Sequence, residues 1–393
     1  MNDQVKIRHY DLDWLRVIAI IILLLFHTGM FFNTWGWHVK NTEQSELFSD
    51  IMIWFHYWRM PLLLFISGAG TFFALGFRSK KAFAKERAKR LMIPLIFGML
   101  VIVPPQIYFE YISKFSSYLD FYPTVFEFQP YPGGSFSWHH LWFILYLFLF
   151  SVICLPLFNY LRKEKSQNFR NKIASVLSKK YGYAVFLIPM IISQFILRPF
   201  FPHQTHDLTD LGYFVHYMLF FLFGYVIYTD ARNWKGLQHK RKFHLVLALI
   251  STVIFYIAWF VKYQISFFAY DFIFHIPATV MSWFIILTAI GYGQKYLNKK
   301  SEILQNMNIG IYPFYILHQS VMITFGYFII QWELNIFTKF LIINILTAIV
   351  CVGTYQLLIK PFNVMRVLFG LKTKTKSEQP VQREYKKVAL QQN

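Results

Sequence analysis

The stretch Asp13-Trp14-Leu15-Arg16 leads directly into an unbroken apolar run, Val17 to Phe26, which is followed by His27. A cation therefore opens an apolar segment of membrane-spanning length, and an imidazole lies inside that segment. Arg16 and His27 are eleven residues apart. That is close to three helical turns, so the two side chains share one helix face, about 16 Å apart along the axis.

The composition of the 393-residue chain is that of a membrane protein. Hydrophobic residues make up 56% of the chain, aromatic residues 21% and charged residues only 15%, whereas about a quarter of a soluble domain is charged. Long apolar runs alternate with short basic segments, which is typical of a polytopic helical membrane protein. Because basic loops of such proteins set topology and meet anionic lipid, we interpret the net charge of +20 in that way and expect no nucleic-acid binding.

Ten apolar segments, each near the ~20 residues that a membrane helix needs, predict the fold. They cover approximately residues 14–34, 51–77, 91–111, 140–160, 183–201, 213–229, 245–261, 273–293, 311–331 and 337–359. The predicted fold class is an all-α, polytopic membrane bundle of about ten transmembrane helices. Residues 1–371 are expected to form one integral membrane domain, and the basic segment 372–393 a disordered cytoplasmic tail.

The distribution of basic residues predicts the orientation of the bundle. With a cytoplasmic N-terminus, 32 of the 39 Lys and Arg residues fall in termini and loops on the cytoplasmic side, and 3 fall in outer loops. The positive-inside rule therefore predicts that both termini are cytoplasmic. The longest outer loop, residues 112–138, is rich in aromatic residues, Pro and Gly. It is expected to lie along the interface or to cap a cavity.

Ionisable side chains inside membrane spans are costly, so they are candidates for function. Arg16 has a plain alternative, because a cation near the inner head groups can snorkel; nothing structural requires an imidazole at His27. Arg59, in the outer half of the second span, is either an interfacial anchor or an anion-binding cation. His318, in the ninth span, is either a packed core histidine or a functional group.

Two further groups of residues lie at or near the two faces of the bundle. Arg87 and Arg90, three residues apart on one helix face of an inner loop, are topology signals or a clamp for the phosphates of a nucleotide-like donor. Eight histidines fall at or near the outer face and as a group are candidates to line a polar vestibule: His38, His56, His139, His140, His203, His206, His216 and His275.

Imidazole and guanidinium are the chemistry available at membrane depth, because the sequence has no Gly-rich phosphate loop, Ser-centred elbow or Cys/His zinc pattern. The spacing of His203, His206 and Asp207 matches no strong ligand motif, so we predict no metal. Imidazole can take a proton from a hydroxyl group near neutral pH or carry a transferred group covalently. Guanidinium can bind phosphate or carboxylate, or stabilise a developing oxyanion.

Along nearly its whole length the chain resembles the membrane acyltransferase-3 family. The first-helix pattern of that family, a basic residue, ten residues and then His, is matched by Arg16 and His27. Its Arg-x-x-Arg pattern is matched by Arg87 and Arg90. The other matching stretches are Ser67-Gly68, His140-Leu141-Trp142-Phe143 and Tyr315 with His318.

Within the family the chain is similar to the branch called glucan biosynthesis protein C, which succinylates periplasmic glucans. The supporting stretches are Asp13 to Arg16, His27 to Phe32, and Arg59-Met60-Pro61 before Phe65-Ile66-Ser67-Gly68. The resemblance implies an acyltransferase for groups other than amino-acyl groups, in the bacterial inner membrane. The implied donor is cytoplasmic acyl-CoA carrying an acetyl or succinyl group, and the implied acceptor is a carbohydrate hydroxyl of a cell-envelope glycan.

The resemblance also implies roles for single residues. His27 is expected to be the essential catalytic residue, as general base or acyl carrier, with Arg16 and His318 as catalytic partners. Arg87 and Arg90 are expected to bind the CoA phosphates. The residues expected to bind the acceptor are Arg59, His38, His140 and Trp142. Anionic lipid is a further expected partner, and a homodimer is left open.

Two other classes of function are compatible with the sequence. A transporter or flippase of a polar or glycolipid substrate also needs buried charges and a central cavity, although no internal repeat is visible. A non-catalytic scaffold or lipid-binding protein is disfavoured by the imidazoles inside the spans. Acyl transfer or acyl-CoA hydrolysis by the purified protein separates these classes.

Overall fold

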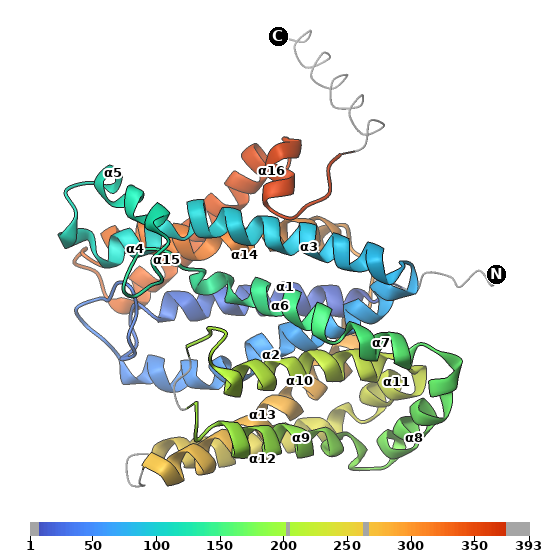
Figure 1. Cartoon of the computed structure of the whole chain (residues 1–393). Helices are drawn as coiled ribbons and strands as arrows, with labels where there is room; N and C mark the ends of the chain where they lie inside the picture. The colour runs from blue at the N-terminus through green and yellow to red at the C-terminus, as the bar shows by residue number, and fades with distance from the viewer. Residues whose placement is uncertain (1–7, 202–204, 262–266, 375–393) are drawn as a thin grey trace.

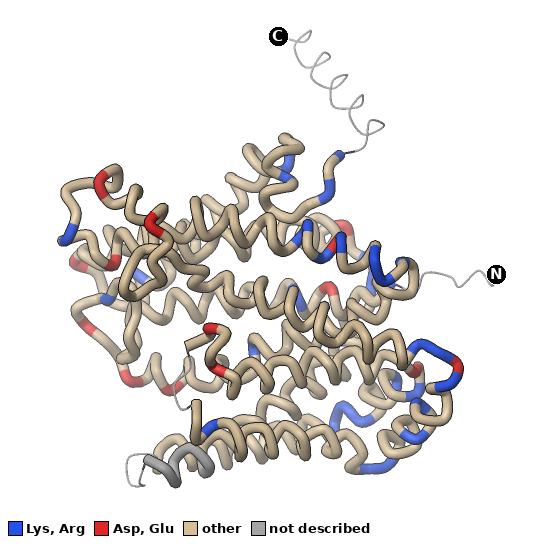
Figure 2. The backbone as a smooth tube through the Cα atoms, in the orientation of Figure 1, with Lys and Arg blue, Asp and Glu red and all other residues tan. Residues whose placement is uncertain are grey.

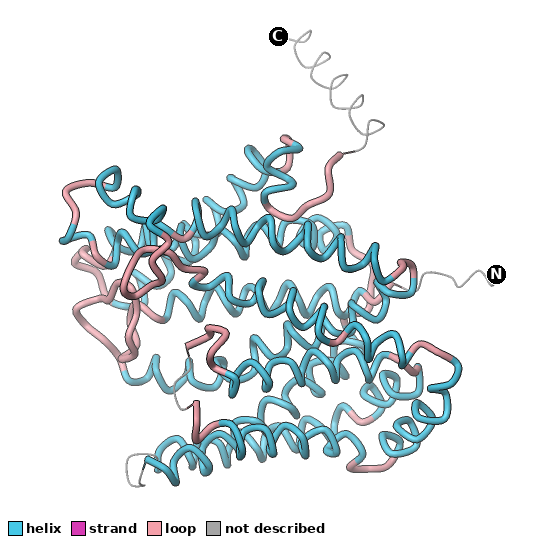
Figure 3. The backbone as a smooth tube through the Cα atoms, in the orientation of Figure 1, coloured by secondary structure: helices cyan, strands magenta, loops and turns pink. Residues whose placement is uncertain are grey.

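The computed structural model describes residues 8–201, 205–261 and 267–374. In these ranges the chain is helical and forms no β-strand (Figure 3). The all-α part of the predicted fold class is therefore confirmed. The predicted tail, 372–393, falls almost wholly outside the described ranges.

The helices follow one another along the chain with short connections (Figure 1). Those of the first half are α1 (Tyr10–Gly29), α2 (Glu46–Gly76), α3 (Lys80–Phe97), α4 (Pro104–Glu110), α5 (Tyr118–Phe121), α6 (Trp142–Ile153), α7 (Leu155–Leu161), α8 (Gln167–Ser178) and α9 (Leu187–Leu197). Those of the second half are α10 (Leu211–Tyr228), α11 (Ala231–His239), α12 (Arg241–Val261), α13 (Phe267–Tyr296), α14 (Glu302–Ile329), α15 (Ile336–Thr354) and α16 (Asn363–Leu368). Short 3-10 or π-helical turns extend several of these helices. Among them are the π-helical turns η1 (Gly98–Ile102) and η8 (Tyr355–Ile359) and the 3-10 turn η4 (His139–Leu141).

Seven helical segments in the described residues are long and apolar enough to cross a membrane. They are α1, α2, the run Lys80–Glu110, α10, α12, Phe274–Tyr296 and the run Ile336–Ile359. Two bent pairs, α6 with α7 at 50° and α8 with α9 at 119°, would raise the number to nine. The 28-residue helix α14 corresponds to the predicted ninth span but is not among the seven. A total of ten spans therefore stays a prediction.

Basic residues collect at one end of the bundle. Figure 2 shows Lys and Arg concentrated where α3 begins and where α8 and α11 lie. This polarity is the one that the loop charges predict. The assignment of that end to the cytoplasm stays a prediction.

Helix α1 packs against α2, α13 and α14, so its side chains face the interior of the bundle. Beside it, α2 and α10 approach each other closely at two glycines. A Cβ atom at Gly68 would lie 1.9 Å from the carbonyl oxygen of Phe221, and one at Gly224 would lie 2.1 Å from that of Phe65. Small residues allow backbones to meet in this way inside a membrane. The close contact holds α2, the helix that carries Arg59, against α10.

Candidate active site

His27 of α1 and His318 of α14 form a hydrogen-bonded pair inside the bundle. Nδ1 of His27 lies 2.9 Å from Nε2 of His318, and the two rings are nearly parallel, at 7°. Nδ1 of His318 lies 2.6 Å from the carbonyl oxygen of Tyr315. A carbonyl oxygen only accepts, so the proton of neutral His318 is on Nδ1 and its Nε2 accepts from His27 Nδ1–H. Neutral His27 therefore keeps its lone pair on Nε2.

His140, in the turn η4 before α6, lies against this pair. Its ring makes an edge contact with His318, with centroids 5.3 Å apart. Nε2 of His140 donates to the carbonyl oxygen of Ile316 at 3.0 Å, so Nδ1 is free to accept from the amide of Gln106 at 3.2 Å. The hydroxyl group of Tyr315 donates to the carbonyl oxygen of His140. These contacts tie α6 to α14 beside the catalytic candidates.

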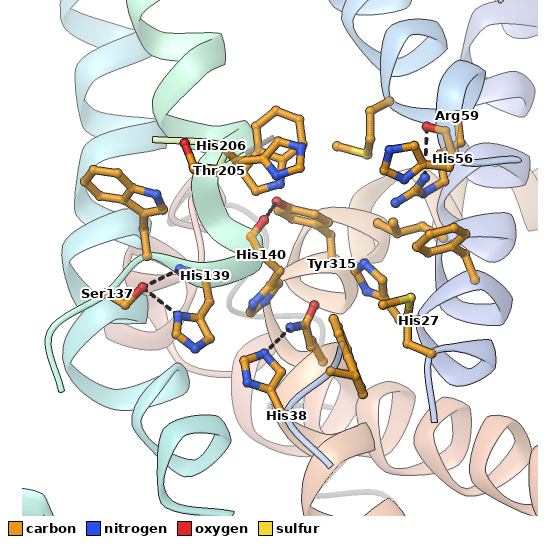
Figure 4. A pocket seen from close by; sticks show the side chains of 18 of the residues that line it. His27, His38, His56, Arg59, Ser137, His139, His140, Thr205, His206 and Tyr315 are labelled. Carbon is orange, nitrogen blue, oxygen red and sulfur yellow. Dashed lines mark hydrogen bonds between the residues drawn. The ribbon is translucent and has the colours of Figure 1, made fainter. Parts of the chain in front are cut away.

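His27 opens onto a cavity of about 330 Å³, which we call the histidine cavity (Figure 4). Its lining combines imidazoles with large aromatic rings. The imidazoles are His27, His38, His56, His139, His140 and His206; the aromatic rings include Phe26, Trp35, Trp37, Tyr131, Trp138, Trp142, Tyr217 and Tyr315. Tyr131, Ser137 and Trp138 come from the loop 112–138, which therefore caps a cavity, one of its two predicted placements.

Arg59 brings a buried cation to the histidine cavity. Its side chain is 6% exposed, and its guanidinium carbon lies 3.4 Å from the centre of the Phe26 ring. Nη1 donates to the carbonyl oxygen of His56 at 3.1 Å, whereas Nε has no hydrogen-bond partner among the described residues. Arg59 forms no ion pair within the described ranges. A buried guanidinium without a carboxylate partner is suited to bind an anionic group of a ligand.

Trp142 forms an aromatic wall of the same cavity. Its ring stacks on that of His206, at 4.3 Å, and on that of Tyr217, at 5.1 Å, and these two rings also lie near each other, at 6.2 Å. Burial, reinforced by the nearby His56 and Arg59, lowers the pKa of His206 to about 3, so this ring is neutral at physiological pH. The wall therefore presents flat, uncharged surfaces.

A second cavity, of about 300 Å³, contains the predicted arginines, and we call it the arginine cavity. Its polar lining consists of Arg16, Ser67, Arg78, Glu86, Arg87, Arg90, Asn308, Tyr312 and Tyr315. Four guanidinium groups and one carboxylate surround the space, which favours a ligand with several negative charges.

Three arginines of this cavity are held by hydrogen-bond partners from separate segments of the chain. Nη1 of Arg16 donates to Asn308 Oδ1 at 3.0 Å and lies 3.3 Å from Asp13 Oδ1. Nη2 of Arg87 donates to Thr71 Oγ1 at 3.1 Å. Nε of Arg90 donates to the carbonyl oxygen of Gly370 at 3.0 Å. Each of these arginines keeps further N–H groups for a ligand, because a guanidinium has five donors.

Tyr315 lines both cavities. The arginine cavity and the histidine cavity therefore meet at this one ring, with Arg16 on one side and His27 on the other. Within the described part of the chain, His318 does not line either cavity. It contacts His27 through the Nδ1 atom of His27.

Residues 9–356 match the family model described as "Acyltransferase domain" of the acyltransferase-3 family. The chain belongs to the acyltransferase-3 family. In this family member, the match includes both cavities and every predicted site residue.

Curated relatives carry the name glucans biosynthesis protein C. The chain is 26% identical to that of Salmonella heidelberg (strain SL476) over 179 residues, 44% of this chain and 44% of the relative. It is 25% identical to that of Salmonella paratyphi A (strain ATCC 9150 / SARB42) over 190 residues, 47% of each. The chain thus spans less than half the length of these relatives.

The structure brings the predicted site residues of this acyltransferase-3 member into two groups. Arg16, Arg87 and Arg90 line the arginine cavity. The predicted residues at the histidine cavity are His27, His38, Arg59, His140 and Trp142. Of the discounted metal group, His203 lies outside the described residues, and the ring of His206 is stacked on Trp142.

Several polar residues at the two cavities were missed in the sequence. Arg78 belongs to the arginine cavity, and Gln319 to the histidine cavity. Glu110, next to the histidine cavity, hydrogen-bonds with His38, and Gln106 hydrogen-bonds with Gln319 at 2.9 Å. Glu110, Gln106 and Gln319 are polar residues within predicted spans, so the rule that singled out His27 also applies to them.

Proposed function

We propose that this protein is a membrane O-acyltransferase. It moves an acetyl or succinyl group from cytoplasmic acyl-CoA to a carbohydrate hydroxyl group of a cell-envelope glycan. The observation that carries the proposal is the position of His27. Its hydrogen-bonded partner leaves a lone pair on Nε2, and the residue lies beside the ring where an arginine-lined cavity meets an aromatic one.

The arginine cavity is the proposed donor site. Acyl-CoA carries a diphosphate and a further phosphate, and guanidinium forks are the side chains best suited to bind phosphate. Arg87 and Arg90 of α3 line this cavity. Helix α3 begins at the end of the bundle where basic residues collect (Figure 2). The thioester reaches toward Tyr315, past Arg16, which lines the same cavity.

The histidine cavity is the proposed acceptor site. Flat aromatic rings bury the apolar faces of sugars, and polar side chains between them bind hydroxyl groups. Trp142 supplies such a face, and His38 and His140 line the cavity beside it. Both ring nitrogens of His140 are used within the protein, whereas Gln319 Oε1 is buried without a hydrogen-bond partner among the described residues. Arg59 is the partner for a negative charge, either on the acyl group or on the acceptor.

The proposed acyl transfer needs only acyl-CoA, the acceptor hydroxyl group and His27. Nε2 of His27 takes the proton of the acceptor hydroxyl as its oxygen bonds to the thioester carbonyl carbon. The carbon–sulfur bond then breaks, and the proton on His27 passes to the leaving thiolate. In the acyl-carrier variant, Nε2 itself bonds to the carbonyl carbon as the carbon–sulfur bond breaks and the CoA thiolate leaves. The acceptor oxygen then displaces the imidazole from that carbon, and the hydroxyl proton passes to the thiolate.

Acyl transfer by His27→Ala tests the proposal. Purified protein in detergent is given radiolabelled acyl-CoA and a glucan acceptor, and ester-linked label on the glucan is measured. Because removing a general base typically costs 10²–10⁴-fold, we expect His27→Ala to lose activity by about that factor. The matched control is His239→Ala, which removes an exposed histidine of α11 that lines neither cavity and should retain activity. Near-normal transfer by His27→Ala would contradict the proposal.

The location and partners of the enzyme are part of the same proposal. A multi-pass protein of the bacterial inner membrane, with the arginine cavity facing the cytoplasm, gives acyl-CoA access to its proposed site. Anionic lipid would meet the basic end of the bundle. Whether two copies associate is open to measurement of mass in detergent.

Transport of a polar or glycolipid substrate is the second candidate. Alternating access needs a buried site that can be reached from either side of the membrane, and two cavities separated by the ring of Tyr315 are compatible with it. Labelled glycolipid that crosses proteoliposome membranes at the same rate with and without acyl-CoA would favour transport over acyl transfer.

A further inference from the structure

Three side chains from separate segments meet at the wall of the histidine cavity. They are His38, from the connection between α1 and α2, Glu110, at the end of α4, and His139, from η4. One ligand atom from each lies within 4.8 Å of the others. All three side chains are half-buried, so they are neither free in solvent nor packed in apolar core.

Glu110 is oriented by two neighbours. One carboxylate oxygen, Oε2, hydrogen-bonds with Nδ1 of His38. The other, Oε1, accepts from the hydroxyl group of Tyr131 at 2.7 Å. Tyr131 also packs edge-on against His139, with ring centroids 4.8 Å apart. The carboxylate is thus fixed with Oε2 toward His38 and Oε1 toward Tyr131.

His139 has an unused nitrogen at this place. Its Nδ1 lies 2.5 Å from Ser137 Oγ (Figure 4), and its ring stacks on that of His38 at 4.7 Å. Its Nε2 is buried and has no hydrogen-bond partner among the described residues. The backbone of His139 is in the left-handed region, with φ of 39°, which a residue with a side chain adopts only where its surroundings hold it.

We propose that His38, Glu110 and His139 bind a divalent transition-metal ion, zinc being the best match. Two imidazole nitrogens and one carboxylate oxygen are a recurrent zinc ligand set with a fourth position left open. Metal-bound histidines and carboxylates are usually held by outer hydrogen bonds. Ser137 and Tyr131 supply such bonds here. With zinc bonds of about 2.0–2.1 Å, ligand atoms lie about 3.3 Å apart. Because the rings of His38 and His139 are stacked, at 13° to each other, ion binding requires the His139 ring to turn about its side-chain bonds.

The bound ion would link the three segments that form this wall of the cavity. His38 and His139 line the cavity, so the site borders the space proposed for the acceptor. A hydroxyl or phosphate oxygen of a ligand could occupy that position. This site is independent of the acyl-transfer proposal, because ion binding can be measured without any substrate.

The prediction that no metal binds rested on local motifs. His38 and Glu110 are 72 residues apart, and the third ligand lies in another loop. Such a set has no local spacing signature, so sequence motifs do not reveal this site.

Metal content and a cobalt spectrum test the site. Full-length protein is purified, stripped with a chelator, and given Zn²⁺ or Co²⁺ alone. We expect about one Zn²⁺ per chain to be retained after gel filtration, and Co²⁺ to give the intense visible bands of a four-coordinate site. Glu110→Gln and His139→Asn should each abolish retention and the bands. Tyr131→Phe keeps all three ligands but removes an outer hydrogen bond, and should weaken Zn²⁺ binding about 10–100-fold.

The control is His206→Asn, which removes a histidine of the same cavity that is not one of the three. It should retain about one Zn²⁺ per chain. Thermal unfolding monitors folding: Zn²⁺ should raise the Tm of the wild type and leave that of Glu110→Gln unchanged. The proposal is overturned if the wild type retains no more Zn²⁺ than Glu110→Gln, or if His206→Asn loses as much as His139→Asn. In that case the three side chains form only a hydrogen-bonded His–Glu pair with a neighbouring imidazole.

Discussion

The tautomer of His27 depends on two successive hydrogen bonds that end at the backbone of α14. The carbonyl oxygen of Tyr315 fixes the proton of His318, and His318 in turn fixes that of His27. The backbone thus acts in the place where many enzymes use a carboxylate to orient a histidine. A neutral acceptor avoids placing another charge at membrane depth.

Arg59 should discriminate between acyl groups at the residue scale. The succinyl group ends in a carboxylate, whereas the acetyl group does not. Since hydrogen bonds to charged groups contribute about 1.5–3 kcal/mol, we expect Arg59→Gln to lower kcat/KM with succinyl-CoA about 10–100-fold. Acetyl transfer should change much less. The measurement is transfer to glucan from each donor in parallel.

A charge-preserving variant serves as the control for Arg59. Arg59→Lys keeps the cation but loses the planar fork, so it should recover part of the succinyl activity. If Arg59→Gln lowered kcat/KM equally with both donors, Arg59 would not bind the succinyl carboxylate. It would then act on the acceptor or stabilise the folded protein.

Tyr315 should keep the two cavities apart. Its ring lines both, and its hydroxyl group anchors it to the backbone of His140. Tyr315→Ala removes the ring, so water should reach the thioester, and acyl-CoA hydrolysis should rise several-fold relative to transfer. Tyr315→Phe keeps the ring and should show a smaller rise. An unchanged ratio of hydrolysis to transfer in Tyr315→Ala would contradict the role.

The positions of some site residues could be predicted from the sequence, and those of others could not. The spacing of Arg16 and His27 predicted a shared helix face, and the structure places both toward the interior at successive cavities. Glu110 and Gln106 were missed although they are polar residues in predicted spans. Their partners, His38 and Gln319, come from distant segments, and pattern reasoning along one helix cannot pair them.

At the scale of elements, the contact between α2 and α10 is predicted to be intolerant of any side chain at Gly68. The Cβ of Gly68→Ala would overlap the carbonyl oxygen of Phe221, which is backbone and cannot rotate away. We expect a loss of about 1–3 kcal/mol in the free energy of unfolding, the usual range for overpacking. Unfolding of the detergent-solubilised protein by denaturant measures it.

Gly353→Ala is the matched control for Gly68→Ala. Gly353 is also in a helix, α15, but a Cβ there would meet nothing within 4 Å. Because Ala is a better helix former than Gly, this change should be neutral or stabilising by up to about 1 kcal/mol. If both substitutions lowered the free energy of unfolding equally, the contact between Gly68 and Phe221 would not be the cause of the loss in Gly68→Ala.

The helices themselves were largely predictable, and their bends were not. Long apolar runs require helices in a membrane, because the backbone has no water to bond. That physical constraint predicted α1, α2, α10 and α12. The break between α6 and α7 and the sharp turn between α8 and α9 depend on tertiary packing, which an apolar run does not encode.

At the scale of the whole molecule, the two cavities give the bundle a direction. The arginine cavity is lined by arginines of α1 and α3, and the histidine cavity is capped by the loop 112–138. Figures 1 and 2 show that loop at the end of the bundle opposite to the one where Lys and Arg collect. Our account is that the acyl group passes from the first cavity to the second at His27, while donor and acceptor stay on opposite sides.

Acyl transfer across a sealed bilayer tests this account most directly. Proteoliposomes are loaded with glucan, labelled acyl-CoA is added outside, and ester-linked label on the trapped glucan is measured. We predict label in wild-type vesicles and none above background in His27→Ala vesicles. Label that forms only when glucan and acyl-CoA share one compartment, or that forms equally in His27→Ala vesicles, would contradict the account.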